Sequence, residues 1–180
     1  AKPPGVMKTC GACNLCCKLA PIEERQKPAG VWCKYARPGN GCAIHGKHPE
    51  ECQSFRCGWL KDPSLDDDWK PTTCKFVIRL DEDLRRIIIS NDPAHPDAWK
   101  KPRYYQAIKR WAQDWGVVSF VVNRATMVYP DQDLEVGEIN PGDAVHRGYR
   151  GGPLSRAPWV RIEPVGGGPH REYVGQYGRS

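Results

Sequence analysis

The sequence predicts an α+β protein in which an irregular, cysteine-rich and metal-clamped N-terminal segment packs on a small antiparallel sheet with one main helix. All nine cysteines of the 180-residue chain fall within its first 74 residues, where apolar periodicity is scarce. Strand-like runs of β-branched residues begin only near residue 76, and they surround a single stretch with helical periodicity. We therefore expect a cysteine-cluster metal-binding segment over residues 1–75, a small α+β unit over residues 76–146, and a Gly/Pro-rich C-terminal extension over residues 147–180.

Composition limits the classes of protein to which the chain can belong. Its hydrophobic fraction is 39%, and no run approaches the roughly 18–20 apolar residues that a membrane-spanning helix needs. The N-terminus lacks the apolar stretch of a secretion signal, and an initial Ala1 is typical of a cytosolic chain whose starting Met has been removed. We expect a cytoplasmic location and no membrane partner. The formal net charge of +6 permits an acidic partner without requiring one.

Two strands and one helix are expected in the middle of the chain. Residues 76–80 and 84–89 are rich in β-branched side chains and flank an acidic turn, which predicts a hairpin. Over residues 102–115, apolar side chains recur at the spacing of one helical face. Pro102 suits the first turn of this helix, and Gly116 suits the position that follows its last turn.

Shorter strands are expected beyond the helix. They cover residues 117–122, 126–129, 134–139 and 159–162, which are rich in β-branched and aromatic side chains. From residue 147 onward the chain contains eight glycines and four prolines in 34 residues. We therefore expect the end of the chain, from residue 166, to be a flexible tail.

The strongest chemical signal is the spacing of the cysteines. Cys10, Cys13, Cys16 and Cys17 follow one another as CxxCxxCC, and a CxxC turn brings two thiolates within reach of one metal ion. Neighbouring side chains diverge, so we expect Cys16 and Cys17 to serve different metals, or one of them to bridge two. The remaining candidate metal ligands are Cys33, Cys42, Cys52 and Cys57.

Disulfides and zinc compete as explanations of these cysteines. Disulfides are typical of small secreted chains, but the odd count, the tight spacing and the lack of a secretion signal disfavour them. We favour zinc, because eight thiolates divide into two tetrahedral sites of four. Three ions with bridging sulfurs stay open, as do sites of three cysteines and one histidine, in which His45 or His48 would be the ligand. The simpler interpretation is that both histidines are exposed residues of a loop.

Iron–sulfur chemistry is the alternative to zinc, with an electron-transfer or redox-enzyme role. Cys10, Cys13 and Cys16 have the opening spacing of a bacterial ferredoxin motif. Ala20 stands where the fourth cysteine of that motif is expected, although Pro21 follows it as the motif requires. A remote cysteine would then have to complete the cluster.

The cysteine pattern resembles that of the CxxCxxCC cysteine-cluster family of the YkgJ type, whose members are described as zinc- or iron-chelating domains. Beyond the CxxCxxCC run, the resemblance includes Cys33, Gly41-Cys42-Ala43-Ile44-His45, Pro49-Glu50-Glu51-Cys52-Gln53-Ser54-Phe55 and Cys57-Gly58-Trp59. It covers residues 7–60 and departs from the family where His48 replaces a common arginine. The resemblance implies metal binding in a cytoplasmic, mostly bacterial protein, and it implies no established reaction.

No residue stands out as catalytic, and we favour a protein that is not an enzyme. Cys74 lies outside the cysteine pattern, and we interpret it as a small buried residue beside the strand that begins at Phe76. Aromatic and basic residues alternate over residues 99–115, but the aromatic ones recur at core spacing. A nucleic-acid partner is therefore not favoured, and metal ions are the partners that we expect.

Overall fold

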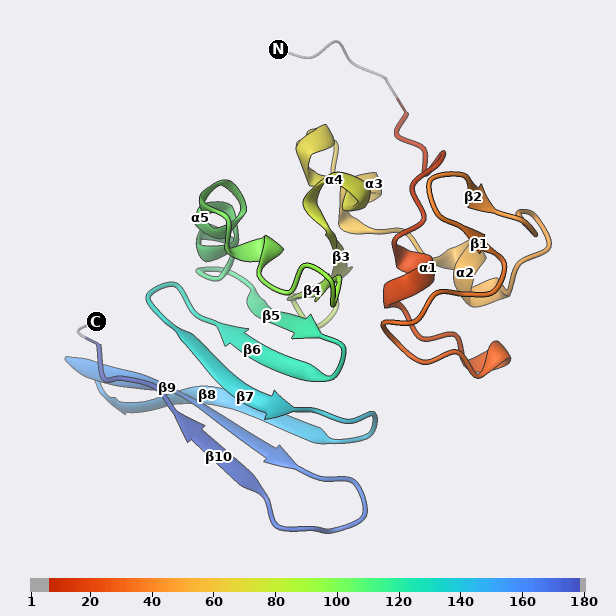
Figure 1. The fold of residues 1–180 in the computed structure, drawn as a ribbon. Coiled ribbons are helices and arrows are strands. Elements are labelled where there is room, and N and C mark those ends of the chain that lie inside the picture. The colour runs from red at the N-terminus through yellow and green to blue at the C-terminus, as the bar shows by residue number, and fades with distance from the viewer. Residues whose placement is uncertain (1–6, 179–180) are drawn as a thin grey trace. The chain divides into compact units, whose positions relative to one another are not determined.

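The computed structural model of the chain describes residues 7–178 and contains both helices and strands (Figure 1). It divides into two compact units. The first comprises the residues up to Leu80 together with Ile89–Trp99, and the second comprises Asp81–Ile88 and the residues from Lys100 onward. The strands form three sheets of two, three and five strands, which makes the fold mixed α+β as the sequence predicts.

The cysteine-rich segment contains only short elements. Its helices are α1 (Cys16–Leu19), η1 (Glu23–Arg25), α2 (Glu50–Ser54), α3 (Gly58–Lys61), η2 (Asp67–Trp69) and α4 (Pro71–Cys74), and its strands are β1 (Ala36–Arg37) and β2 (Gly41–Cys42). Helices this short are not stable by themselves, because the free-energy cost of nucleating a helix exceeds the gain from one turn of hydrogen bonds. Their positions must therefore be held by contacts with other parts of the segment.

The largest sheet has five strands in the order β3-β4-β5-β6-β7. The strands are β3 (Phe76–Asp81), β4 (Arg86–Asn91), β5 (Gly116–Val121), β6 (Arg124–Val128) and β7 (Asp133–Glu138). The sheet is mixed, so the prediction of an antiparallel sheet is wrong in this respect. β5, β6 and β7 are antiparallel neighbours, whereas the chain passes from β4 to β5 through a helix, the connection that parallel neighbours require. The Gly116 N–H donates to the Arg85 carbonyl at 2.9 Å, so β4 and β5 begin at the same end of the sheet.

The main helix, α5 (Pro102–Trp111), is the one helix of seven or more residues in the described part of the chain. It buries Tyr104 and Ile108, which belong to the predicted apolar face. The helix ends at Trp111, short of the predicted residue 115. The residues that follow form tight turns, with the Asp114 N–H donating to the Trp111 carbonyl at 3.1 Å.

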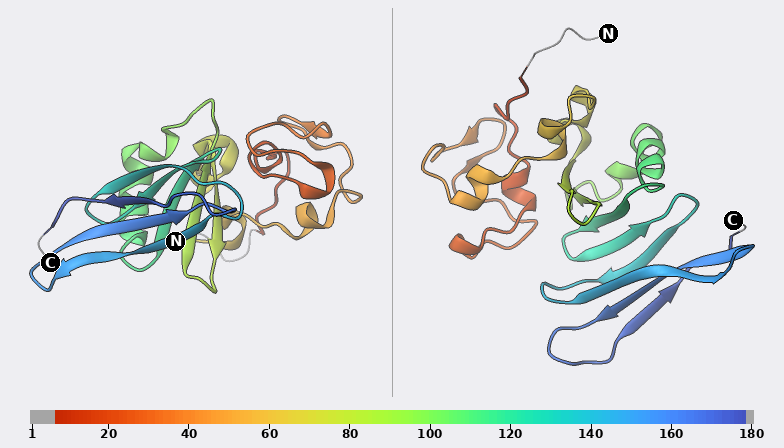
Figure 2. Two further views of the ribbon diagram at one scale, coloured as in Figure 1. Left: turned by 90° about the horizontal axis from the view of Figure 1, so that it is seen from below. Right: turned by 180° about the vertical axis from the view of Figure 1, so that it is seen from behind.

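The C-terminal extension forms most of a three-stranded sheet, whose last strand lies beyond residue 166, where the sequence predicts a flexible tail (Figure 2). Its strands are β8 (Ala144–Gly152), β9 (Ser155–Glu163) and β10 (Arg171–Val174), in the order β10-β9-β8. β8 has few apolar residues and three glycines, so its sequence lacks a strand pattern. Pairing with β9 places Val145 opposite Ile162, and Ile162 joins Val160 in a core with buried side chains of β5, β6 and β7. Pairing with β9 therefore determines the position of β8, which its own sequence does not predict.

A glycine fixes how closely α3 approaches β3 in the first unit. A Cβ atom added to Gly58 would lie 2.8 Å from Ile78 Cγ2 and 3.1 Å from Ile78 Cβ, closer than side-chain carbons pack. Ile78 is buried in the core and has no room to move. The close approach matters for the cysteine segment, because Cys57 immediately precedes α3.

We predict that Gly58→Ala lowers the stability of the protein, by about 1–3 kcal/mol, because the added methyl group overpacks the contact with Ile78. Helix propensity alone would give the opposite sign. Gly152→Ala is the matched control, since no atom lies within 4 Å of the position of its added Cβ. Thermal unfolding followed by circular dichroism measures both variants. An unfolding midpoint for Gly58→Ala equal to or above that of the control would contradict the packing argument.

Candidate metal centre

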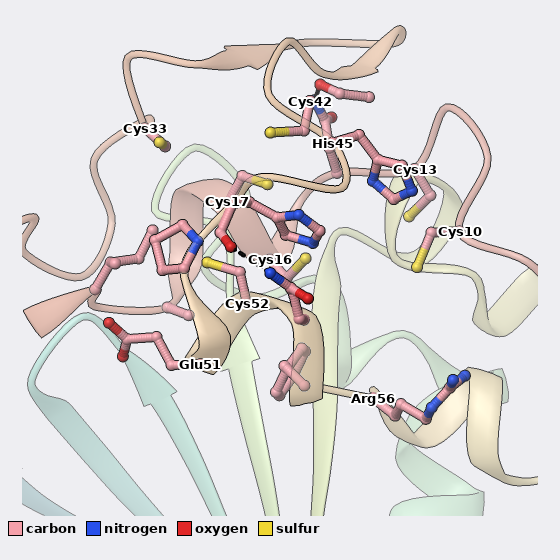
Figure 3. A pocket seen from close by; sticks show the side chains of 18 of the residues that line it. Cys10, Cys13, Cys16, Cys17, Cys33, Cys42, His45, Glu51, Cys52 and Arg56 are labelled. Atoms are coloured by element: carbon pink, nitrogen blue, oxygen red, sulfur yellow. Dashed lines mark hydrogen bonds between the residues drawn. The ribbon is translucent and has the colours of Figure 1, made fainter. Parts of the chain in front are cut away.

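Seven of the eight candidate cysteines line one cavity of about 1010 Å³ in the first unit (Figure 3). They are Cys10, Cys13, Cys16, Cys17, Cys33, Cys42 and Cys52. The eighth, Cys57, is buried and is not among the residues that line the cavity. All nine cysteines of the chain carry free thiols. Folding thus gathers side chains from positions 10 to 52 around a single space.

Cys57 lies near the first two cysteines of the motif even though it is outside the cavity lining. A turn closes the first CxxC, with the Cys13 N–H donating to the Cys10 carbonyl at 2.7 Å. Burial raises the pKa of the Cys10 thiol, and the negative charges of Cys57 and Cys13 raise it further. Burial likewise raises the pKa of Cys57, with a contribution from Cys13. Cys10 and Cys57 are therefore both influenced by Cys13, and the Arg56 guanidinium opposes the effect at Cys10 by lowering its pKa.

The later cysteines gather around Cys17. The Cys33 N–H donates to the Cys17 carbonyl at 3.0 Å, and Cys42 lies on β2, paired with Ala36 on β1. Burial raises the pKa of Cys52, and the charges of Cys17, Cys33 and Cys42 add to the increase. These four thiols, which span 35 positions in the sequence, are thus neighbours in the fold.

Cys16 and Cys17 are adjacent in α1, and each affects the ionisation of the other. Interaction with the Cys17 thiol, together with burial, raises the pKa of Cys16, whereas interaction with the Cys16 thiol lowers the pKa of Cys17 to about 7. The charges of Cys10 and Cys13 also raise the pKa of Cys16, which places this thiol near the start of the motif. The adjacent pair therefore lies between the two groups of thiols.

Lys27 is a positively charged group beside these thiols that the sequence analysis missed. Its ammonium donates to the carbonyl oxygens of Lys18 at 3.1 Å, Ala20 at 2.6 Å and Pro28 at 2.8 Å. Burial lowers the pKa of Lys27, while the charges of Cys33 and Cys17 oppose that decrease. Its charge in turn lowers the pKa of Cys17. Lys27 therefore both fastens the chain after α1 and supplies a cation close to the sulfur atoms.

Asn14, inside the CxxCxxCC motif, is a second residue whose role the sequence did not reveal. Its side chain is 4% exposed, and its Nδ2 donates to the carbonyls of Arg37 at 2.9 Å and Gly41 at 2.8 Å. These carbonyls belong to the β1–β2 hairpin, so Asn14 holds Cys42 near the motif. The sequence pattern does not reveal this role of Asn14, because its hydrogen-bond partners are more than 20 positions away.

An ion pair fastens α1 to the segment that follows β4. Lys18 Nζ lies 2.6 Å from Asp92 Oδ1, and the Asp92 carboxylate also accepts the Ala94 N–H at 3.0 Å. Burial by itself would raise the pKa of Asp92, but the hydrogen bonds from Lys18 and Ala94 and the charges of Lys18 and His95 outweigh it and lower the pKa. The carboxylate is therefore held ionised beside the lysine that directly follows Cys17.

His45 and His48 both line the cavity and stack on each other, with ring centroids 5.0 Å apart and an interplanar angle of 21°. His48 Nδ1 accepts the Gly46 N–H at 3.0 Å, which leaves its Nε2 as the nitrogen open to a metal. His45 is exposed and His48 is half-buried. Both histidines therefore have access to the cavity that the thiols line, and Figure 3 shows His45 beside Cys13.

Cys74 is buried as the sequence predicts, with 0% of its surface exposed. Its Sγ lies 3.1 Å from the Phe76 carbonyl oxygen, and burial raises the pKa of the thiol to about 12. A thiol with such a pKa is protonated at neutral pH and does not serve as a nucleophile.

Within residues 7–178, no three histidine, cysteine, aspartate or glutamate side chains are already arranged so that they could hold one metal ion. The thiols are close enough to affect one another's pKa, but they do not form a finished coordination sphere. Metal binding at this cavity would require the side chains to adjust. The geometry thus identifies which cysteines are neighbours without assigning bond lengths or angles.

Comparison with known proteins adds no relative: no family model matches the chain, and no curated protein or solved structure is significantly similar to it. Among residues 7–178, none of the helices combines the length and the apolar character that crossing a bilayer requires. The functional argument therefore depends on the cavity and its residues.

We predict that Asn14→Asp weakens zinc binding about tenfold or more, because the carboxylate cannot donate to the Arg37 and Gly41 carbonyls. Two lost hydrogen bonds correspond to about 1–3 kcal/mol. Competition with a chromogenic chelator measures the affinity. Asn40→Asp is the control, because Asn40 lines the same cavity and undergoes the same change of charge, but its side chain is exposed. Equal affinities for the two variants would show that Asn14 does not position the hairpin.

We also predict that Asp92→Asn removes a contribution to stability that depends on pH. The carboxyl pKa is lowered in the folded protein, so its contribution is present above the unfolded-state pKa of about 3.9 and is lost as the pH falls through the folded-state value. The difference in unfolding midpoint between wild type and Asp92→Asn should be largest near pH 7 and should shrink below about pH 4. Asp83→Asn, at an exposed turn, is the control. A difference that stays constant down to pH 3 would exclude the ion pair as its cause.

Proposed function

We propose that this chain is a cytoplasmic metal-binding protein that holds zinc, two ions in all, in a structural or metal-handling role. The ligands would be Cys10, Cys13, Cys16, Cys17, Cys33, Cys42, Cys52 and Cys57. The observation that supports this proposal most directly is the convergence of seven of these cysteines on one cavity, with the eighth close to Cys10 and Cys13. Free thiols are the ligand form that zinc needs, and the cytoplasm keeps thiols reduced.

The charge distribution around the cavity favours thiolates bound to metal. Four thiolates around a divalent zinc ion leave a net charge of −2, which nearby cations stabilise. Lys27 and Arg56 lower the pKa of Cys17 and Cys10, respectively, so a cation faces each end of the cysteine motif. Bound zinc would supply a closed, structural site and would favour the ionised form of every thiol that it coordinates.

The scarcity of apolar packing in the segment is a second argument for metal. Among the described residues 20–56, only Ile22 and Pro49 are buried. A segment of this length that buries so little needs another source of folding energy, and structural zinc supplies it in many small domains. The resemblance of residues 7–60 to the CxxCxxCC family agrees with this proposal.

An iron–sulfur cluster is the competing proposal, and the spacing of Cys10, Cys13 and Cys16 is the observation that favours it. The same thiols would then hold iron in an electron-transfer or redox role. Zinc is preferred, because the eight cysteines divide evenly into two four-thiolate sites and because Ala20 takes the place of the fourth cysteine of the ferredoxin motif.

Metal analysis of the full chain, purified without oxygen and without added metal, tests the proposal. We expect a colourless protein with about two zinc ions per chain. Cys74→Ala should retain both ions, because this buried thiol is not among the proposed ligands, whereas Cys52→Ser should lose zinc. A brown preparation that contains iron and sulfide would replace zinc by an iron–sulfur cluster. A protein that contains neither metal and has its thiols paired as disulfides would overturn metal binding altogether.

A further inference from the structure

Backbone contacts tie Cys10 and Cys13 to the part of the chain that contains Cys57. Two residues before Cys10, the Lys8 ammonium donates to the Trp59 carbonyl at 2.8 Å, and Trp59 follows Cys57 by two positions. The same ammonium donates to the carbonyls of Asp62 and Leu65, each at 2.5 Å. The start of the motif therefore runs beside α3. Cys57 is 7% exposed and Trp59 is 5% exposed, so this neighbourhood is anchored in the core.

A separate set of contacts ties Cys17 to Cys33 and to the cysteine of the hairpin. The Cys33 N–H bonds to the Cys17 carbonyl at 3.0 Å, and the Ala36 N–H bonds to the Cys33 carbonyl at 2.9 Å. Ala36 is the register partner of Cys42, so the two hairpin cysteines are linked through one residue. In Figure 3, Cys33 lies on the side of the cavity away from Cys10 and Cys13.

The adjacent pair Cys16 and Cys17 completes both groups. Each group otherwise has three thiols, and a structural zinc ion takes four ligands. Cys16 completes the CxxCxxC spacing that begins at Cys10, whereas Cys17 bonds to Cys33 through its carbonyl, and Figure 3 shows Cys52 on the same side of the cavity as Cys17. Successive residues of a helix point about 100° apart, so two neighbours on α1 can serve two ions.

We infer that the eight cysteines form two separate sites, one made of Cys10, Cys13, Cys16 and Cys57, and the other made of Cys17, Cys33, Cys42 and Cys52. The inference rests on the proposed metal-binding function and assigns each ligand within it. The first site is attached to the buried residues around α3. The second is attached to short elements and to Lys27, so its ion is the first to leave when a chelator is added.

Paired substitutions test the assignment by counting ions in native mass spectrometry of the full chain with zinc as the metal. Cys13→Ser with Cys57→Ser should leave one ion, and Cys33→Ser with Cys42→Ser should also leave one. The crossed pair, Cys13→Ser with Cys42→Ser, should leave none. Loss of both ions from either of the first two variants, or retention of an ion by the crossed pair, would overturn the division.

A measurement on the unaltered chain keeps the inference testable if a variant fails to fold. Cadmium-113 NMR of the cadmium-loaded protein should show two resonances in the range of four-sulfur coordination, with no splitting between the two ions. Coupling through a shared sulfur would mean a bridged cluster and would overturn the division while leaving metal binding intact. A wild-type chain that binds neither zinc nor cadmium would instead refute the proposed function.

During chelator titration, hydrogen exchange should increase over residues 31–52 before it increases around Trp59, and the reverse order would overturn the ranking of the two sites.

Discussion

The crowding of ionisable sulfur in a segment with almost no apolar core is the constraint on which this structure depends. Eight thiols converge on one region, while among the described residues 20–56 only Ile22 and Pro49 are buried. Without metal, burial and the charges of neighbouring thiols raise the pKa of Cys10, Cys52 and Cys57, so these three thiols stay largely protonated and interact only weakly. Bound divalent cations would attract the ionised thiolates, and this attraction would be the strongest interaction in the segment. The α-helices there can be as short as four or five residues, because metal coordination, and not long helices, would stabilise the fold of the segment.

Polar side chains prepare the backbone for that role. Lys8 and Lys27 each donate to three carbonyl oxygens, and Asn14 donates to two. Short elements leave many carbonyls without partners, and an ammonium or amide group satisfies several of them at once. Each of these side chains acts next to a cysteine: Lys8 precedes Cys10, Asn14 follows Cys13, and Lys27 lies beside Cys17. The hydrogen bonds thus place the ligands approximately, and metal coordination would supply the final arrangement.

The sequence predicted most of what local pattern can determine. Apolar periodicity identified α5, and β-branched runs identified β3 to β7 to within a few residues, because these elements bury one face of their own. β8 and β10 were missed, since their place depends on pairing with β9 and not on an apolar pattern. The parallel arrangement of β4 and β5 could not be read from either strand. Among the site residues, the cysteines were visible from spacing, whereas Asn14, Lys18 and Lys27 were not, because every partner that gives them a role is distant in sequence or is a backbone carbonyl.

The proposed metal content also changes how the charge of the chain is interpreted. The formal net charge of +6 suggests a basic protein that attracts acidic partners. Two four-thiolate zinc sites contribute −2 each, which lowers the net charge of the loaded chain to +2. Lys27 and Arg56 then serve as counter-charges to the sulfur ligands and are not available to bind an external anion. An iron–sulfur core of charge +2 held by four thiolates would have the same effect. With the proposed metal content, much of the basic excess would be balanced within the molecule by the sulfur ligands.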